Sequence, residues 1–225
     1  MSRIALYAQF TFCVWSFSWL PGVAANLYVS PTGNHTAPYH SWGDASTNIQ
    51  VAIEYATAGD RITVDRGIYY ENLNFNGKDI ELVSRFAESR DQQDVDLTII
   101  DGRFTNRCFT FISGESSNAL VQGFTVRRGK APGPSGQAHY GGGIFIFQSS
   151  PTLKNLVVTN CTSRFWGGGM YIGSSYSVID NILVAGNVAR VRVAESHINC
   201  HMASFRIPVS LETVVFTEEE GSLPG

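Results

Sequence analysis

Charged residues are scarce in this chain, and neither sign dominates. Asp, Glu, Lys and Arg make up 16% of the 225 residues, with 16 basic and 19 acidic side chains and a net charge of −3. A nucleic-acid-binding domain normally carries a marked excess of Lys and Arg on one surface. The sequence shows no such excess, so we expect no nucleic-acid partner.

Long apolar runs are absent except at the N-terminus. Arg3 precedes an uncharged, mostly apolar stretch over residues 4–20, and small residues follow at 23–25. This order is typical of a secretory signal peptide. We therefore expect residues 1–25 to be removed and the mature chain to begin at Asn26, to be secreted or held at the cell surface, and to have no membrane-spanning segment. A retained membrane anchor is the alternative interpretation.

Cysteine is too rare for a disulfide framework. Cys13 would leave with the signal peptide, and Cys108, Cys161 and Cys200 remain as an odd number. Their spacing matches no metal-binding motif, so we predict no metal site. We expect Cys108 and Cys161 to be buried thiols.

The chain does contain an internal repeat of 26 residues. The triplet Gly141-Gly142-Gly143 recurs as Gly167-Gly168-Gly169, without the Gly-Lys-Ser/Thr that a phosphate-binding loop requires. A fixed period of this size indicates one supersecondary unit stacked on copies of itself. The flanking residues that recur at the same spacing are Tyr140 with Trp166, Ile144 with Met170, Phe145 with Tyr171, Ile146 with Ile172, and Asn155 with Asn181.

Within each repeat the apolar residues alternate in short runs, such as Ile144/Ile146 and Leu156/Val158, which is strand periodicity. Asn tolerates the left-handed backbone that a sharp corner needs, so Asn155 is expected at a bend. Together these features predict an all-β fold, a single-stranded right-handed parallel β-helix (a solenoid) with its coils over residues 60–190.

The two ends of the chain differ from the repeats. Residues 26–59 are predicted to form an entry strand and a short N-terminal capping helix, in which Thr47 and Gln50 have the spacing of a capping box. Residues 191–225 lack the repeat, because Val193-Ala194-Glu195 stands where glycines are expected. We therefore expect an irregular or truncated C-terminal end with little order.

Several segments resemble secreted right-handed parallel β-helix proteins of the pectin-lyase-like superfamily. The resemblance covers about residues 27–187 and implies the fold more specifically than the activity, because that superfamily includes pectate lyases, other polysaccharide lyases, glycosidases and noncatalytic surface proteins. The segments are Tyr28-Val-Ser-Pro-Thr-Gly33, Gly67-Ile-Tyr-Tyr-Glu71, Asn76-Gly-Lys78, Thr98-Ile-Ile-Asp-Gly102, Gly123-Phe-Thr-Val126 and Ser149-Ser-Pro-Thr-Leu-Lys-Asn155.

The resemblance implies two alternative functions. The first is an exported protein that binds extracellular or cell-surface polysaccharide through the wall of the solenoid. The second is a pectate-lyase-like polysaccharide lyase acting on uronate-containing glycans, which would use Ca²⁺ to neutralise the sugar carboxylate and a base to remove a proton. Asp101, Glu115 and Asp180 are scattered and suggest no calcium site. The catalytic residues stay unassigned, and whether the protein is an enzyme stays open.

Basic and aromatic residues around the loop 129–140 are the candidates for binding polysaccharide. The basic ones could equally form an ordinary solvated surface. Aromatic residues one coil apart, on the face opposite to the aliphatic ones, could stack on sugar rings or could pack beneath the loop. The candidate substrate-binding residues are Arg127, Arg128, Lys130, His139, Tyr140, Phe145, Trp166 and Tyr171.

Overall fold

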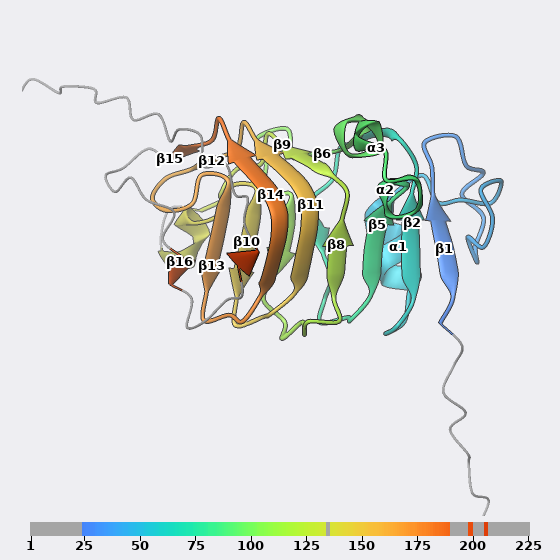
Figure 1. Ribbon diagram of the computed structural model, residues 1–225, viewed down its shortest axis with the longest axis horizontal. Helices are drawn as coiled ribbons and strands as arrows, with labels where there is room; N and C mark the ends of the chain where they lie inside the picture. Colours follow the sequence, from blue (N-terminus) through green and yellow to red (C-terminus); the bar gives the residue numbers. More distant parts are fainter. Residues whose placement is uncertain (1–23, 134–135, 190–197, 200–204, 207–225) are drawn as a thin grey trace, which may run out of the picture.

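The computed structural model describes residues 24–133, 136–189, 198–199 and 205–206. In this part of the chain strands predominate, helices are few and short, and every pairing between strands is parallel. Figure 1 shows the strands side by side in an elongated row, with β1 at one end and β13 and β16 near the other. The fold is therefore all-β with parallel sheets, as the sequence predicts.

The strands form three sheets. The largest contains β1 (Asn26–Val29), β2 (Arg61–Val64), β3 (Gly67–Tyr69), β5 (Glu81–Ser84), β6 (Thr98–Asp101), β8 (Leu120–Gln122), β9 (Thr125–Arg127), β11 (Thr152–Thr159), β14 (Val178–Ala185) and β17 (Phe205–Arg206). The second contains β4 (Leu73–Asn74), β7 (Phe109–Phe111), β10 (Ile144–Phe147), β13 (Met170–Gly173) and β16 (Ile198–Asn199). The third pairs β12 (Thr162–Ser163) with β15 (Val188–Ala189).

The predicted period of 26 residues is also the register of the strand pairs that follow the glycine triplets. Between β10 and β13, Ile144 pairs with Met170 and Ile146 with Ile172. The same offset continues beyond the last glycine triplet, because Ile172 of β13 pairs with Ile198 of β16. We call one such unit a layer. Strands β8, β9 and β10 form one layer, and β11, β12 and β13 form the next. Of the predicted C-terminal segment, only β16 and β17 fall within the described residues.

Asparagine forms the bend inside the long strands, as predicted. Asn155 and Asn181 have φ angles of 50° and 51°, and Asn181 donates a side-chain hydrogen bond of 2.7 Å to Asn155. Residues 152–154 of β11 pair with β8, whereas residues 157–159 pair with β9. The Asn bend therefore turns the chain from one part of the large sheet into the next.

The core lies between the sheets. Ile146 and Ile172 are 0% and 3% exposed within it, which confirms the predicted inward face. Cys108 and Cys161 are buried free thiols, as expected, whereas Cys13 and Cys200 lie outside the described residues. Fully buried Phe side chains fill the larger spaces, namely Phe75, Phe109, Phe111 and Phe124.

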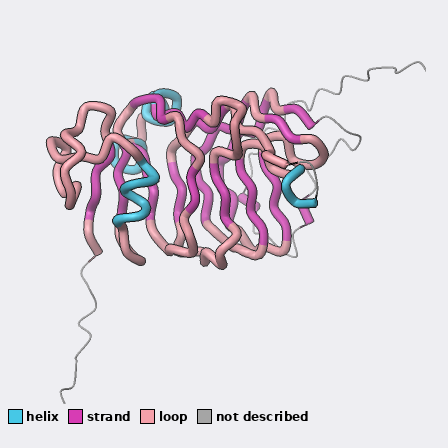
Figure 2. Tube along the Cα trace, turned by 180° about the vertical axis from the view of Figure 1, so that it is seen from behind, coloured by secondary structure: helices cyan, strands magenta, loops and turns pink. Residues whose placement is uncertain are grey.

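Helix α1 (Ile49–Tyr55) covers the first strand of the second sheet, and its Ile49, Ala52 and Ile53 are buried. Figure 2 shows this helix, seen from behind, in front of the strands near one end of the row. The predicted capping box of Thr47 and Gln50 is wrong. Asn48 caps the helix, and the Gln50 carboxamide instead hydrogen-bonds both the N–H and the C=O of Asn74 in β4, at 3.0 and 3.1 Å.

Both ends of α1 are bound by side chains that follow it in the sequence. The Glu71 carboxylate accepts hydrogen bonds from the N–H groups of Ile49 and Gln50, at 2.8 and 2.9 Å. Burial raises the pKa of Glu71, and these two N–H groups partly offset that effect. The Lys78 ammonium donates to the carbonyls of Ile53, Glu54 and Ala56 at the other end. Each charge complements the helix dipole at its end.

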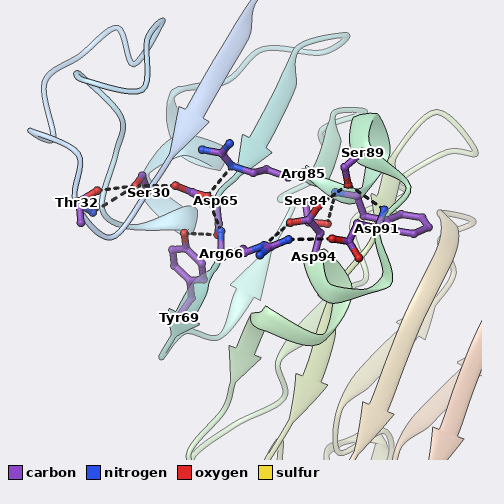
Figure 3. Close-up of polar contacts among 11 residues, drawn as sticks. Ser30, Thr32, Asp65, Arg66, Tyr69, Ser84, Arg85, Ser89, Asp91 and Asp94 are labelled. Carbon is purple, nitrogen blue, oxygen red and sulfur yellow. Dashed lines mark hydrogen bonds and ion pairs between the residues drawn. The ribbon is translucent and has the colours of Figure 1, made fainter.

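Two small helices, α2 (Phe86–Ser89) and α3 (Gln92–Leu97), are tied to the corner between β2 and β3 by ion pairs (Figure 3). Arg85 pairs with Asp65 at 2.6 Å, and Arg66 pairs with Asp94 at 2.6 Å. Burial alone would raise the pKa of Asp94, but hydrogen bonds from Arg66 and Ser89 lower it on balance. This network fixes the inserted helices to the N-terminal layers.

Residues 1–23 of the predicted signal peptide lie outside the described residues. None of the described helices is both long enough and apolar enough to cross a membrane.

Candidate functional site

Arg127 and Arg128, two of the predicted binding residues, are bound to one carboxylate. Asp101 at the end of β6 is 0% exposed, and its Oδ2 lies 2.8 Å from Arg127 Nε and 2.5 Å from Arg128 Nη2. Arg127 faces Asp101 across the β6–β9 pairing, and Arg128 follows in a left-handed conformation that turns its side chain back to the same carboxylate. Both arginines therefore hold adjacent layers together.

The charge state of this cluster is fixed by its hydrogen bonds. Burial by itself would raise the pKa of Asp101, but hydrogen bonds from Arg128, the Arg103 N–H and Arg127 lower it on balance. The hydrogen bond to Asp101 raises the pKa of Arg128 in turn. The ionised carboxylate of Asp101 thus engages both guanidinium groups.

The predicted aromatic residues are brought together, but as a stack of rings. Tyr140 lies 4.9 Å from Trp166 and 4.9 Å from Tyr171, and Phe145 lies 5.4 Å from Tyr171, measured between ring centres. The ring planes are within 14–28° of parallel. Ring faces are thus directed at one another, which favours packing over a platform on which sugars stack.

Arg107 completes this stack, and no sequence pattern predicts its place there. Its guanidinium lies 3.9 Å from the centre of the Phe145 ring, and Tyr171 stacks on the same ring. Phe145 is only 2% exposed as a result. The position of Arg107 is set by its place before β7, one layer below Phe145, and no local pattern reveals that neighbour.

His139 also packs inside the loop. It ends the 3₁₀ helix η1 (Gly136–His139), is buried, and meets the Phe165 ring edge to face at 4.5 Å. Its Nδ1 has no hydrogen-bond partner among the described residues. His139 therefore joins the loop to the segment before Trp166 and is not presented to solvent.

Among the predicted residues, Lys130 lines an open groove in the described part of the chain. The groove has a volume of about 690 Å³. Arg164 lines it as a second cation, and Phe104, which is 42% exposed, adds an aromatic surface. The other described residues along it are Ala131, Pro132, Gly133, Asn160, Cys161, Thr162, Ser163 and Val188, so no acidic side chain from the described part of the chain lines it.

Stacked turns form the floor of this groove. The Lys130 N–H donates to the carbonyl of Asn106 at 2.9 Å, and the Ala131 N–H donates to that of Thr162 at 3.0 Å. In the next layer the Val188 N–H donates to the carbonyl of Cys161 at 2.9 Å. The groove thus crosses turns from successive layers, which explains why residues about 30 positions apart line it together.

Charge is segregated along the chain in a way that favours anions at the groove. Residues 97–189 contain seven Lys and Arg against three Asp and Glu, whereas residues 24–96 contain five against eleven. Two of those three acidic residues, Asp101 and Glu115, are buried and hydrogen-bonded. Within the described structure neither Lys130 nor Arg164 forms a salt bridge, so both charges remain available for a ligand.

A second hollow, of about 610 Å³, lies beside Trp42 and the ion pairs of Figure 3. Its two arginines, Arg66 and Arg85, are both engaged with carboxylates. It therefore offers a ligand no unpaired cation, in contrast to the groove at Lys130.

Metal ligands do not gather at either place: the described residues contain no group of three or more His, Cys, Asp or Glu side chains arranged to hold an ion. Comparison of the chain with protein-family models, with curated proteins and with solved structures finds no match.

Proposed function

We propose that this chain is an exported right-handed parallel β-helix that binds an anionic polysaccharide in the groove lined by Phe104, Lys130 and Arg164. The parallel pairing and the 26-residue register support the solenoid. Right-handed crossovers between parallel strands are favoured in about 98% of cases, which supports the handedness.

The observation that carries the binding function is the presence, in one groove, of an exposed ring and two cations that have neither a salt bridge nor an acidic neighbour in the groove among the described residues. A charged sugar needs cations for its carboxylate or sulfate groups, donors and acceptors for its hydroxyls, and apolar surface for its ring faces. Lys130 and Arg164 supply the cations. Hydrogen-bond donors and acceptors come from Asn160, Thr162 and Ser163, and Phe104 supplies the apolar surface.

An extended chain suits this groove better than a compact ligand. The turns that form it belong to neighbouring layers, and hydrogen-bonded strands lie about 4.8 Å apart. Lys130 and Arg164 belong to successive layers, so a linear polymer that follows the groove can contact both of them at once. The aromatic stack beside it, with ring faces already occupied, supports the wall.

The test is retention on immobilised polygalacturonate, with neutral dextran as the control polymer. We expect the double variant Lys130→Gln/Arg164→Gln to bind about tenfold more weakly at low salt, because each exposed ionic contact contributes up to about 1 kcal/mol. Wild-type binding should itself weaken as salt screens the charges.

The control variant Arg61→Gln/Lys154→Gln removes the same charge from the ten-stranded sheet, and should bind within about twofold of wild type. Equal binding by the groove variant, or wild-type protein that does not bind polygalacturonate at all, would contradict the proposal.

The same preparation addresses the lyase alternative, in which Ca²⁺ would serve as cofactor. Formation of unsaturated uronate, followed by its ultraviolet absorbance, would establish catalysis in place of simple binding.

A further inference from the structure

Arg107 is a half-buried cation that forms no salt bridge with any described residue. Its Nε donates to the carbonyl of Tyr140 at 3.0 Å and its Nη2 to that of Gln137 at 2.6 Å. Burial lowers its pKa to about 10, so the guanidinium is still charged at neutral pH. Two carbonyls and the ring of Phe145 thus stabilise a charge that pairs with no carboxylate of the described residues.

Both carbonyls belong to the later part of loop 129–140, and its earlier part lines the groove. Backbone hydrogen bonds hold the early part, through Lys130 and Ala131. The two parts are linked across the loop by the Gly133 N–H, which donates to the carbonyl of Ala138 at 3.1 Å. Where Arg107 places the later part therefore affects where Pro132 and Gly133 lie along the groove.

We propose that Arg107 is a positioning residue that clamps residues 136–140 against the aromatic stack and thereby sets the shape of the groove. The planar guanidinium can stack on a ring while it donates to two carbonyls in its own plane. A lysine ammonium carries the charge but cannot do both. These contacts by themselves support the role of Arg107 in holding the loop. Its effect on glycan binding rests on the proposed function.

The experiment compares Arg107→Lys and Arg107→Met with Arg103→Met by amide hydrogen exchange and by binding to polygalacturonate. Arg103 is the matched control, because its guanidinium lies over the Tyr70 ring at 3.8 Å and no hydrogen bond joins its side chain to the described part of the loop. For both Arg107 variants we expect the rate of amide hydrogen exchange in residues 131–141 to rise at least about tenfold. Exchange in β7 and β13 should not change, and binding should fall about fivefold.

Three results would each contradict one part of the proposal. Unchanged exchange in residues 131–141 of Arg107→Lys would overturn the clamp, and this variant keeps the test valid if Arg107→Met fails to fold. Faster exchange with unchanged binding would overturn the link between the loop and the groove. If wild type binds no polygalacturonate, the proposed function fails, whereas the exchange data still decide whether Arg107 holds the loop.

Discussion

A single buried carboxylate, Asp101, determines the roles of two arginines that the sequence marks as binding candidates. Arg127 and Arg128 stand beside the exposed loop, and a basic pair in such a place suggests ligand contact. Their side chains instead meet an ionised group that is completely buried. The two cations that line the groove, Lys130 and Arg164, form no salt bridge within the described part of the chain.

Replacement of Asp101 by Asn should reduce the free energy of unfolding by about 3 kcal/mol at pH 7, because two guanidinium groups lose their shared counter-ion. The folded pKa of Asp101 is lowered relative to the unfolded chain. Its charge therefore stabilises the fold above the unfolded pKa of about 3.9, and this contribution is lost as the pH falls through that value and then through the folded pKa.

Urea unfolding of wild type and Asp101→Asn, at pH values from neutral to acid, measures this difference. The gap between the two proteins should be widest near neutral pH and should narrow below about pH 4. Asp96→Asn, on the exposed side of α3, is the control and should change stability by less than about 0.5 kcal/mol at any pH. A constant gap across the series would contradict a stabilising role for the charge of Asp101.

At the scale of elements, helix α1 depends on residues that follow it in the chain. Seven residues are too few for a helix to be stable alone in water. Glu71 binds the first N–H groups, Lys78 binds three of the last carbonyls, and the apolar face is buried. The helix is therefore part of the first layers and is expected to form together with them.

Substitution of Lys78 by Met keeps most of the aliphatic chain and removes the ammonium that binds the carbonyls of Ile53, Glu54 and Ala56. We expect a loss of about 1–2 kcal/mol in the free energy of unfolding, because charged hydrogen bonds to a helix C-terminus are lost. Lys154→Met on β11 is the control and should change stability little. Equal melting temperatures for Lys78→Met and wild type would argue against this role.

The features that sequence could predict are those that repeat. The 26-residue period, the Asn bends and the inward isoleucines follow from patterns that each layer shows by itself. Asn48 as helix cap, the pairing of Gln50 with β4 and the contact of Arg107 with Phe145 do not repeat. Each depends on a neighbour from another layer, so no spacing in the sequence could reveal it.

The sequence predicts less of the candidate site than of the fold. The loop and Lys130 were identified, because a long insertion between strands predicts a projecting segment. Phe104 and Arg164 were missed, since they enter the groove only through the stacking of irregular turns. The aromatic residues were correctly placed outside the aliphatic core, but the direction of their ring faces depends on side-chain packing, which alternation does not determine.

At the scale of the whole molecule, glycine sets how closely successive layers approach. A Cβ atom on Gly142 would lie 2.3 Å from the carbonyl oxygens of both Gly168 and Thr162. Both obstacles are backbone atoms of the next layer and cannot rotate away. Contact between layers therefore explains the second and third glycines of each triplet, whereas the first, Gly141 or Gly167, has a left-handed φ of 64° or 65°.

Gly142→Ala should destabilise the protein by about 3 kcal/mol or more, because relief of the clash requires two layers to separate. Gly43→Ala is the matched control, since the nearest atom to its added Cβ would be 3.8 Å away. Thermal unfolding followed by circular dichroism measures both variants. A Gly142→Ala protein as stable as Gly43→Ala would show that the layers can move apart at little cost.

The hydrogen bonds of Gln50 affect whether the sheets of two molecules can join edge to edge in a concentrated solution. A parallel sheet that ends in an exposed strand can accept a strand from another molecule, which is a common beginning of aggregation. The Gln50 carboxamide occupies the N–H and C=O of Asn74 at the start of the second sheet. Residues 39 and 46 similarly bond to Tyr28 in β1. These bonds block strand addition at β4 and at the centre of β1, and so oppose edge-to-edge polymerisation of chains through these two strands.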